Sequence, residues 1–184
     1  MAELRPSIWR TCRALANRQR LQSVRHLLTH PESTVSEMAR DMRLSVSSAS
    51  QHLRVLNARG FLGVRRRGRH VYYRVGSDDS VPDAAAILTA AADALRVSRK
   101  AVDSVFRIVT ACTHPRRLDI LHSLGRGDLT FDEIRRATGA SRSALHRHIS
   151  KLKARGFVEE SDGVFRCCKA RDPLTRTLVS LASK

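Results

Sequence analysis

Two stretches of the chain carry the same pattern, LSVSSASQHLRVLNARGFL at residues 44–62 and ASRSALHRHISKLKARGFV at residues 140–158. In both, a serine precedes a run whose apolar residues share one helical face, and a glycine followed by phenylalanine comes near the end. Serine is a favoured N-cap, and glycine suits the left-handed backbone at which many helices end. Each stretch is therefore predicted to be a helix followed by an extended segment.

The similarity continues upstream, so that residues 14–62 align with residues 111–158. Identical residues keep their order across the alignment, and the matched pairs include Ala14/Ala111, Arg20/Arg117, Thr34/Thr130, Glu37/Glu133 and His52/His148. Chance does not preserve both identity and order over this length. We therefore predict two copies of one domain.

Each copy also predicts two helices before the quoted one. Asn17 is placed to cap a helix that reaches Thr29, and Pro115 opens its counterpart where a missing N–H costs nothing. Thr34 and Thr130 each begin a short helix with a glutamate three residues later, which is the capping-box pattern. The short helix, a brief turn and the quoted helix together form a helix-turn-helix.

A β-hairpin is predicted after each helix-turn-helix. Residues 61–75 hold two β-prone runs around a basic tip, and residues 157–168 hold two around a tight, acidic turn. A helix-turn-helix followed by a hairpin is a winged helix. The predicted fold class is thus mainly α with small β-hairpin wings, arranged as tandem winged helix-turn-helix domains.

The stretch at residues 44–62, with residues 14–21 upstream of it, resembles the recognition-helix region of ArsR-type winged-helix transcriptional regulators. The second copy carries a weaker version of the same motifs. The resemblance implies a DNA-binding regulator, although members of that family are usually single-domain homodimers. In the family, the first and last helices of each domain build the dimer interface, which implies a pseudo-dimer within this one chain.

These elements divide the chain into three parts. We predict a winged-helix domain at residues 1–80, a helical connection at residues 81–110, and a second winged-helix domain with a C-terminal helix at residues 111–184. An apolar stripe at helical spacing runs through the connection, with a joint at residues 98–100. Two independent domains on a helical string are the alternative to a pseudo-dimer.

Charge indicates the partner. Lysine and arginine outnumber aspartate and glutamate by 34 to 17, for a formal net charge of +17 that is spread over both halves. A globular protein with this much positive charge repels itself unless a polyanion neutralises it, so double-stranded DNA is the predicted partner. The sequence holds no apolar run near the roughly 20 residues of a membrane span and no signal peptide. We therefore expect a cytoplasmic, nucleoid-associated protein with no membrane partner.

Helical spacing places the candidate DNA-contacting residues opposite the apolar faces. They are Val46, Ser47, Ser50, Gln51 and Arg54 with the wing residues Arg65, Arg66, Arg67 and Arg69 in the first copy, and Arg142, Ser143, His146, Arg147 and Ser150 in the second. Gln51 is expected to pair with adenine and Val46 to touch a thymine methyl. Arg142 and Arg147 are expected to read guanine or hold phosphate, whereas the acidic second wing is expected to avoid phosphate.

Regulators of the resembled family often sense metals or redox state through cysteines in the helix-turn-helix or through His and carboxylate sets on the closing helix. Neither location carries such a set in this sequence. Cys112 is predicted to lie in the core, and Cys167 and Cys168 are predicted to point to opposite sides of a strand. We therefore predict no metal and no cofactor.

Three functions are compatible with these features. The first is a sequence-specific transcriptional regulator, specifically a repressor, which binds DNA as a monomeric pseudo-dimer or, alternatively, as a homodimer. The second is an architectural, chromosome-associated protein with little sequence preference, and the third is a winged-helix adaptor for other proteins, against which the charge argues. An enzyme is not predicted, because no glycine-rich phosphate loop, zinc motif or nucleophile elbow is present.

Overall fold

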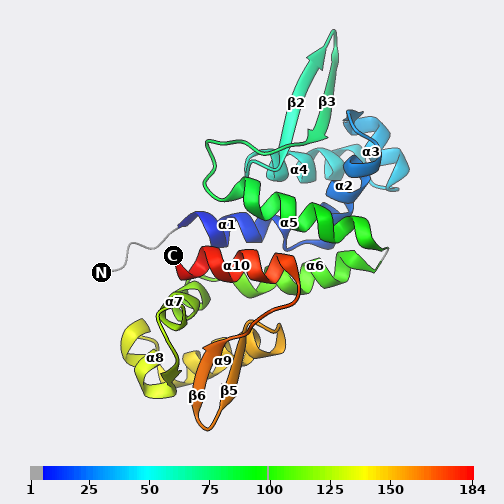
Figure 1. Ribbon diagram of the computed structural model, residues 1–184. Helices are drawn as coiled ribbons and strands as arrows, with labels where there is room; N and C mark the ends of the chain where they lie inside the picture. The colour runs from blue at the N-terminus through cyan, green and yellow to red at the C-terminus, as the bar shows by residue number, and fades with distance from the viewer. Residues whose placement is uncertain (1–5, 99) are drawn as a thin grey trace.

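The structure is a computed structural model that describes residues 6–98 and 100–184 (Figure 1). Helices dominate, and two small antiparallel sheets accompany them, so the predicted class of a mainly helical protein with small hairpins is confirmed. In chain order the elements are α1 Pro6–Leu15, α2 Arg18–Thr29, β1 Ser33–Thr34, α3 Val35–Asp41, α4 Val46–Asn57, β2 Leu62–Arg67, β3 His70–Val75, α5 Ala84–Val97, α6 Ala101–Val109, the 3-10 helix η1 Thr110–Cys112, α7 Pro115–Leu124, β4 Leu129–Thr130, α8 Phe131–Thr138, α9 Arg142–Ala154, β5 Val158–Ser161, β6 Val164–Cys167 and α10 Pro173–Ser183.

One order of elements occurs twice: a helix, a two-residue strand, two helices and a hairpin. We call residues 18–75, from α2 to β3, the first unit, and residues 115–167, from α7 to β6, the second unit. Both sheets have three antiparallel strands in the same order, β1–β3–β2 and β4–β6–β5. Our sequence analysis missed β1 and β4, because two residues are too few to show an alternating pattern. Each unit has the element order of a winged helix.

The predicted helix caps are present. The side chain of Asn17 accepts a hydrogen bond from the backbone N–H of Arg20 at 3.0 Å. The capping boxes form at Thr34 and Thr130, whose backbone N–H groups each donate to the glutamate three residues later at 2.7 Å. Gly60, φ +70°, lies after the end of α4 and has its counterpart at the end of α9. Local sequence therefore sets where these helices begin and end.

Two aligned arginines make the same hydrogen bonds in the two halves. The Nε of Arg20 donates to the carbonyl of Ala14, and the Nε of Arg117 donates to the carbonyl of Ala111 at 2.5 Å. Burial lowers the pKa of both guanidinium groups from its ordinary value. Each arginine ties the first helix of its unit to the helix that precedes it. The pairs Ala14/Ala111 and Arg20/Arg117 thus match in structure as well as in sequence.

Four helices, α1, α5, α6 and α10, lie between the units, and we call them the central layer (Figure 1). Within it α5 packs on α10 and α1 packs on α6, while α2 also contacts α6 and α1 also contacts α7. The fully or almost fully buried residues of the layer are Ile8, Cys12, Leu15, Ile87, Leu95, Val105, Val109, Leu174 and Leu178. Burying one such aliphatic side chain contributes about 1.5–3 kcal/mol, against about 0–1 kcal/mol for an exposed ion pair. Apolar packing therefore holds the two units together.

The sequence predicted one feature of this layer, the joint between α5 and α6, but not another, the helix α1. α5 ends at Val97 and α6 begins at Ala101, so the joint predicted at Ser98 and Lys100 is confirmed, while Arg99 lies outside the described residues. Our sequence analysis did not predict α1, although its buried residues are spaced as one helical face requires. None of the helices in the described part of the chain is both long and apolar enough to span a membrane.

Candidate nucleic-acid interface

The polar face of α4 is available for contact. The Ser45 hydroxyl caps the helix by accepting from the backbone N–H of Ser48 at 3.1 Å. Ala49, Leu53 and Leu56 are fully buried and pack into the core. Burial of these three residues orients the opposite face of the helix toward solvent.

The candidate residues on that face are not equally exposed. Ser47, Gln51 and Arg54 are exposed, and Val46 exposes 56% of its surface at the start of the helix, but Ser50 is half-buried. The Nε of Arg54 donates to the carbonyl of Ser50 at 3.4 Å, so this side chain lies back along its own helix. The first turn of α4 is uncharged, which leaves Gln51 and the small side chains around it to meet a ligand.

The wing of the first unit carries the four predicted arginines, all exposed, but they fall into two pairs. Arg65 and Arg67 form ion pairs with Glu32, with N–O distances of 3.6 and 2.8 Å. Sequence analysis missed this acceptor, which lies in the turn before β1 with a left-handed φ of +64°. Among the described residues, no carboxylate forms an ion pair with Arg66 or Arg69. Two of the four arginines are therefore already engaged within the protein, where they share a single carboxylate that offsets one of their two charges.

We call α4 and its counterpart α9 the reading helices. The helix α9 is built like α4 but carries different charges. The Ser141 hydroxyl accepts from the backbone N–H of Ala144 at 3.4 Å, and Leu145, Ile149 and Leu152 are buried. All five candidate residues are exposed, as predicted: Arg142, Ser143, His146, Arg147 and Ser150. The exposed face of the first two turns of α9 therefore carries two arginines and a histidine, whereas the exposed face of α4 carries no charge before Arg54.

The second wing is short and carries acidic residues, as the sequence predicted. It pairs β5 with β6, and Glu160 on β5 accepts an ion pair from Lys153 of α9 at 2.5 Å. Its turn contains Asp162 with a left-handed φ of +53°. Negative charge at this tip disfavours an approach to phosphate, so the two wings differ in electrostatic character as well as in length.

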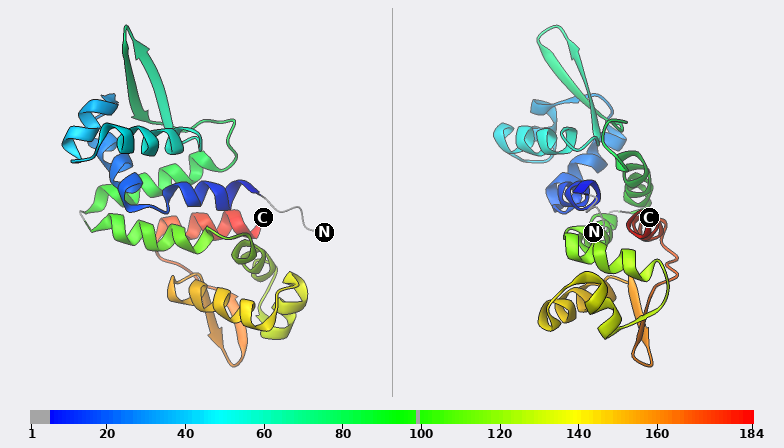
Figure 2. Two further views of the ribbon diagram at one scale, coloured as in Figure 1. Left: turned by 180° about the vertical axis from the view of Figure 1, so that it is seen from behind. Right: turned by 90° about the vertical axis from the view of Figure 1, so that its left-hand side faces the viewer.

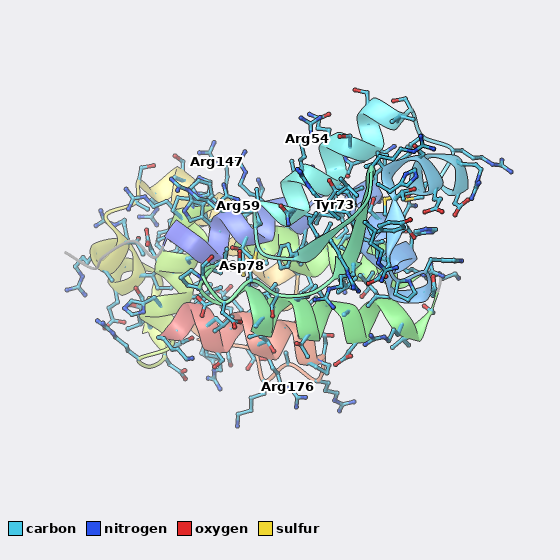
Figure 3. The ribbon with its side chains drawn as sticks, turned by 90° about the horizontal axis from the view of Figure 1, so that it is seen from above. Arg54, Arg59, Tyr73, Asp78, Arg147 and Arg176 are labelled. Atoms are coloured by element: carbon cyan, nitrogen blue, oxygen red, sulfur yellow. The ribbon has the colours of Figure 1, made fainter. Side chains whose placement is uncertain are left out.

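The two reading helices, α4 and α9, lie on the same side of the molecule. The right-hand view of Figure 2 shows α4 and α9 on one side of the molecule and α5 and α10 of the central layer on the opposite side, with the two wings at opposite ends. In the view with side chains, Arg54 and Arg147 extend from the same edge of the molecule, whereas Arg176 of α10 extends from the opposite edge (Figure 3). The polar faces of α4 and α9 thus form parts of one extended surface, which we call the reading face.

The two aligned histidines brace the reading helices from behind. His52 shares a hydrogen bond of 2.9 Å with the side chain of Gln19 on α2, and the ring of His148 lies 4.5 Å from that of His114 at the start of α7. Burial, followed by the positive charges of His114 and nearby basic residues, lowers the pKa of His148 to about 4. Burial also lowers the pKa of His52. Both histidines are neutral at neutral pH and act as parts of the scaffold.

The four cysteines are buried or half-buried. Cys12 and Cys112 are fully buried and their thiols touch, and this contact together with burial raises the pKa of Cys12 well above its usual value. Burial raises the pKa of Cys167 to about 11. The prediction that Cys112 belongs to the core is confirmed. Across the described ranges, no three His, Cys, Asp or Glu side chains come together in a way that could hold a metal ion.

A match to a known protein family falls on the second unit. Residues 114–160 match the protein-family model described as "Bacterial regulatory protein, arsR family". The matched region runs from just before α7 into β5 and includes α8 and α9, although the motifs of the first copy carried the stronger resemblance in the sequence. No curated protein matches the chain. The match indicates that the second unit contains an ArsR-type helix-turn-helix. Such a domain indicates a non-enzymatic regulator of transcription that binds double-stranded DNA.

Proposed function

We propose that the protein is a transcriptional repressor in which two winged-helix domains bind double-stranded DNA as one chain, with α4 and α9 in neighbouring major grooves. The observation that carries this proposal is the common orientation of the two helices on the reading face (Figures 2 and 3). An α-helix fits the major groove, and residues of its N-terminal half reach the base edges.

The proposed domains follow the three-part division of the sequence. Residues 1–80 form the first domain and residues 111–184 the second, with the connection at residues 81–110. In this arrangement α1 and α5 flank the first unit as α6 and α10 flank the second. The first domain thus contributes α1 to the central layer and the second contributes α10, while the connection supplies the closing helix of the first copy, α5, and the opening helix of the second, α6.

Contacts within the central layer support a pseudo-dimer rather than independent domains. Equivalent helices pair with each other, α1 with α6 and α5 with α10. The cross-contacts are reciprocal, since α2 meets α6 in the way that α7 meets α1. Such like-with-like and reciprocal pairing is what a two-fold axis produces between the subunits of a homodimer. A pseudo-two-fold axis between the domains would direct both reading helices toward the same DNA face.

The DNA site we propose is asymmetric. A homodimer presents identical helices and selects a palindrome, but here α4 offers Val46 and Gln51 where α9 offers Arg142 and Arg147. Two half-sites of unlike sequence, about one helical turn apart, match the two helices. The basic wing adds backbone contacts on the flank next to the first half-site, and the acidic wing adds none.

Repression in this proposal is steric. A chain fixed across two grooves of a promoter excludes polymerase from the same DNA. A signal that shifted α1 and α5 against α6 and α10 would change the spacing of α4 and α9 and release the site. The buried core of the central layer supports a fixed spacing in the absence of such a signal.

Selection from a library of random duplexes, followed by sequencing, tests the proposed function. We expect one sharp motif made of two unlike half-sites. The variant with Gln51 and Arg142 both replaced by alanine is the control, because these exposed side chains are the proposed base-reading groups and contribute little to the core. A diffuse result would overturn the proposal in favour of an architectural protein, and the absence of DNA binding would favour an adaptor.

Light scattering of the free protein tests the pseudo-dimer. We expect the mass of a single chain, 20.6 kDa. The same mass of protein is expected on the selected duplex, since one chain supplies both reading helices. A stable dimer of the free protein that protects a palindrome would contradict the proposal.

A further inference from the structure

An aromatic ring links the two helices of the second helix-turn-helix at the reading face. Phe131 is the first residue of α8, and its ring centroid lies 4.4 Å from that of His146 on α9. The guanidinium carbon of Arg142, the first residue of α9, lies 5.6 Å from the centroid of the same ring. On its other side Phe131 contacts Phe165 of β6, a buried residue, at 6.5 Å between centroids. The ring is thus held by the core and in turn holds two exposed side chains.

The position of Arg142 is unfavourable for the helix itself. A cation in the first turn of a helix opposes the positive end of the helix dipole. Among the described residues, no ion pair to a carboxylate compensates Arg142. The face of the Phe131 ring is the compensating partner, because an aromatic face attracts a guanidinium group. The arrangement places a cation at the N-terminal end of α9, which is the end that would enter a major groove. The unfavourable interaction of this cation with the helix dipole is not explained by a purely structural role.

The first unit lacks this arrangement. In the alignment of the two copies, Val35 takes the place of Phe131, Val46 that of Arg142, and Ser50 that of His146. Neither the ring nor the cation is present there, although the backbone elements are the same. The stack therefore is not required to build the helix-turn-helix.

Stacking prepares Arg142 for the recognition of one particular base. A guanidinium group reads guanine through two parallel hydrogen bonds to O6 and N7, which requires the plane of the group to be fixed. A side chain already held on a ring loses less freedom on binding than one that is free in solvent. The next basic residue, Arg147, is not stacked on Phe131 and suits phosphate contact.

We propose that Phe131 is a positioning residue that holds Arg142 toward the base edges, so that α9 reads a guanine in its half-site. The inference rests on the proposed function, because it assumes that α9 enters a major groove. It chooses guanine over phosphate as the partner of Arg142, two alternatives that the sequence left open, and it adds a residue, Phe131, that was not among the sequence-based candidates.

The test compares three variants on one duplex of about 30 base pairs, the best sequence selected by the wild-type protein. Phe131→Leu keeps an apolar side chain against Phe165 and removes the aromatic face, whereas Phe131→Tyr keeps that face. Val35→Leu makes a matched change in the first unit. Fluorescence anisotropy gives the affinity for this duplex, for duplexes in which each guanine of the α9 half-site becomes adenine, and for a random duplex.

We expect the wild-type protein to lose about 10-fold or more in affinity when the guanine read by Arg142 is replaced. In Phe131→Leu this loss falls to about 3-fold or less, while the affinity for the random duplex and its salt dependence stay unchanged. Phe131→Tyr and Val35→Leu keep the wild-type discrimination. A structural role for Phe131 would instead weaken binding to every duplex alike, and that outcome would overturn the inference.

A fallback variant covers the case in which Phe131→Leu does not fold, and two further outcomes separate the inference from the proposed function. If Phe131→Leu unfolds, as circular dichroism would reveal, Arg142→Lys replaces it, since lysine keeps the charge and cannot make the paired contact; unchanged discrimination by Arg142→Lys overturns the inference. If the wild-type protein has a sequence preference but no guanine in the α9 half-site matters, only the inference fails. If it has no sequence preference at all, the proposed function fails.

Discussion

The first and second units share a backbone plan and differ in what they expose. α4 begins with small, uncharged residues beside a wing that carries four arginines, while α9 begins with Arg142 and lies beside an acidic wing. The buried faces are nearly interchangeable, since Ala49, Leu53 and Leu56 correspond to residues of the same kind in α9. The comparison teaches that buried residues maintain one scaffold while exposed residues assign base contact and backbone contact differently to its two copies.

The largest expected effect concerns the charge that both units share. If the reading face and the basic wing make about 6–10 phosphate contacts, affinity for DNA falls roughly 10³–10⁵-fold between about 50 and 200 mM salt. The reason is that each neutralised phosphate releases bound counterions, and release is less favourable when salt is concentrated. Filter binding over a salt series measures the slope. A nearly flat slope would contradict an electrostatic role for either unit.

The next effect separates base reading in the first unit from that in the second. Gln51→Ala is expected to relax the preference at one or two base pairs of one half-site only, by about 5–150-fold on the best sequence. The opposite half-site keeps its preference, because α9 is untouched. Affinities for single-base variants of the selected duplex measure this. Uniform weakening across all variants would show that Gln51 holds the backbone and does not read a base.

A smaller effect tests the basic wing, which only the first unit has. The double variant Arg66→Ala, Arg69→Ala is expected to weaken binding to every sequence by about 10-fold and to lower the salt slope by about 2. The matched double variant Arg65→Ala, Arg67→Ala is expected to have a smaller effect, since ion pairs to Glu32 hold these two side chains and offset one of their two charges.

Equal losses in the two double variants would mean that Glu32 releases its partners to DNA. A change in base preference, rather than in overall affinity, would assign the wing a reading role. Titrations of one selected and one random duplex distinguish these results.

The smallest effect concerns pH and distinguishes the two aligned histidines. The pKa of His148 is lowered to about 4, so between its usual pKa of about 6.5 and pH 4 the unfolded chain binds more protons than the folded one. Stability is therefore full above about pH 6.5, falls as pH drops through this window, and levels off below about pH 4. Urea unfolding at about pH 7.5 and 5 measures the loss. We expect His148→Gln to reduce the pH dependence more than His52→Gln, because His114 and several basic residues add to the effect of burial at His148, and the reverse order would contradict this electrostatic difference.

Local features of the fold could be predicted from the sequence, because they depend on neighbours in the chain. Asn17, Thr34 and Thr130 cap the helices where the pattern placed them, and the repeat located both hairpins. The helix α1 was not predicted, although the repeat continues upstream into it. Ile8 aligns with Val105 of α6, and Leu15 aligns with Cys112 of η1.

Features that depend on tertiary contacts were beyond the sequence. Nothing in the pattern shows that Glu32 folds back onto Arg65 and Arg67, more than thirty residues away, or that Phe131 stacks on Arg142. Ser50 was predicted to face solvent and is half-buried. The exposed candidates were otherwise placed by helical periodicity alone, which fixes a face and leaves the partners of each side chain undetermined.

The central claim is that one chain binds two unlike half-sites, and a hydroxyl-radical footprint on the selected duplex tests it most directly. We predict two protected segments about one helical turn apart on the same face of the DNA, with additional backbone protection only on the flank beside the first half-site. A footprint with two-fold symmetry, equal on both flanks, would contradict the claim and would indicate a homodimer on a palindrome.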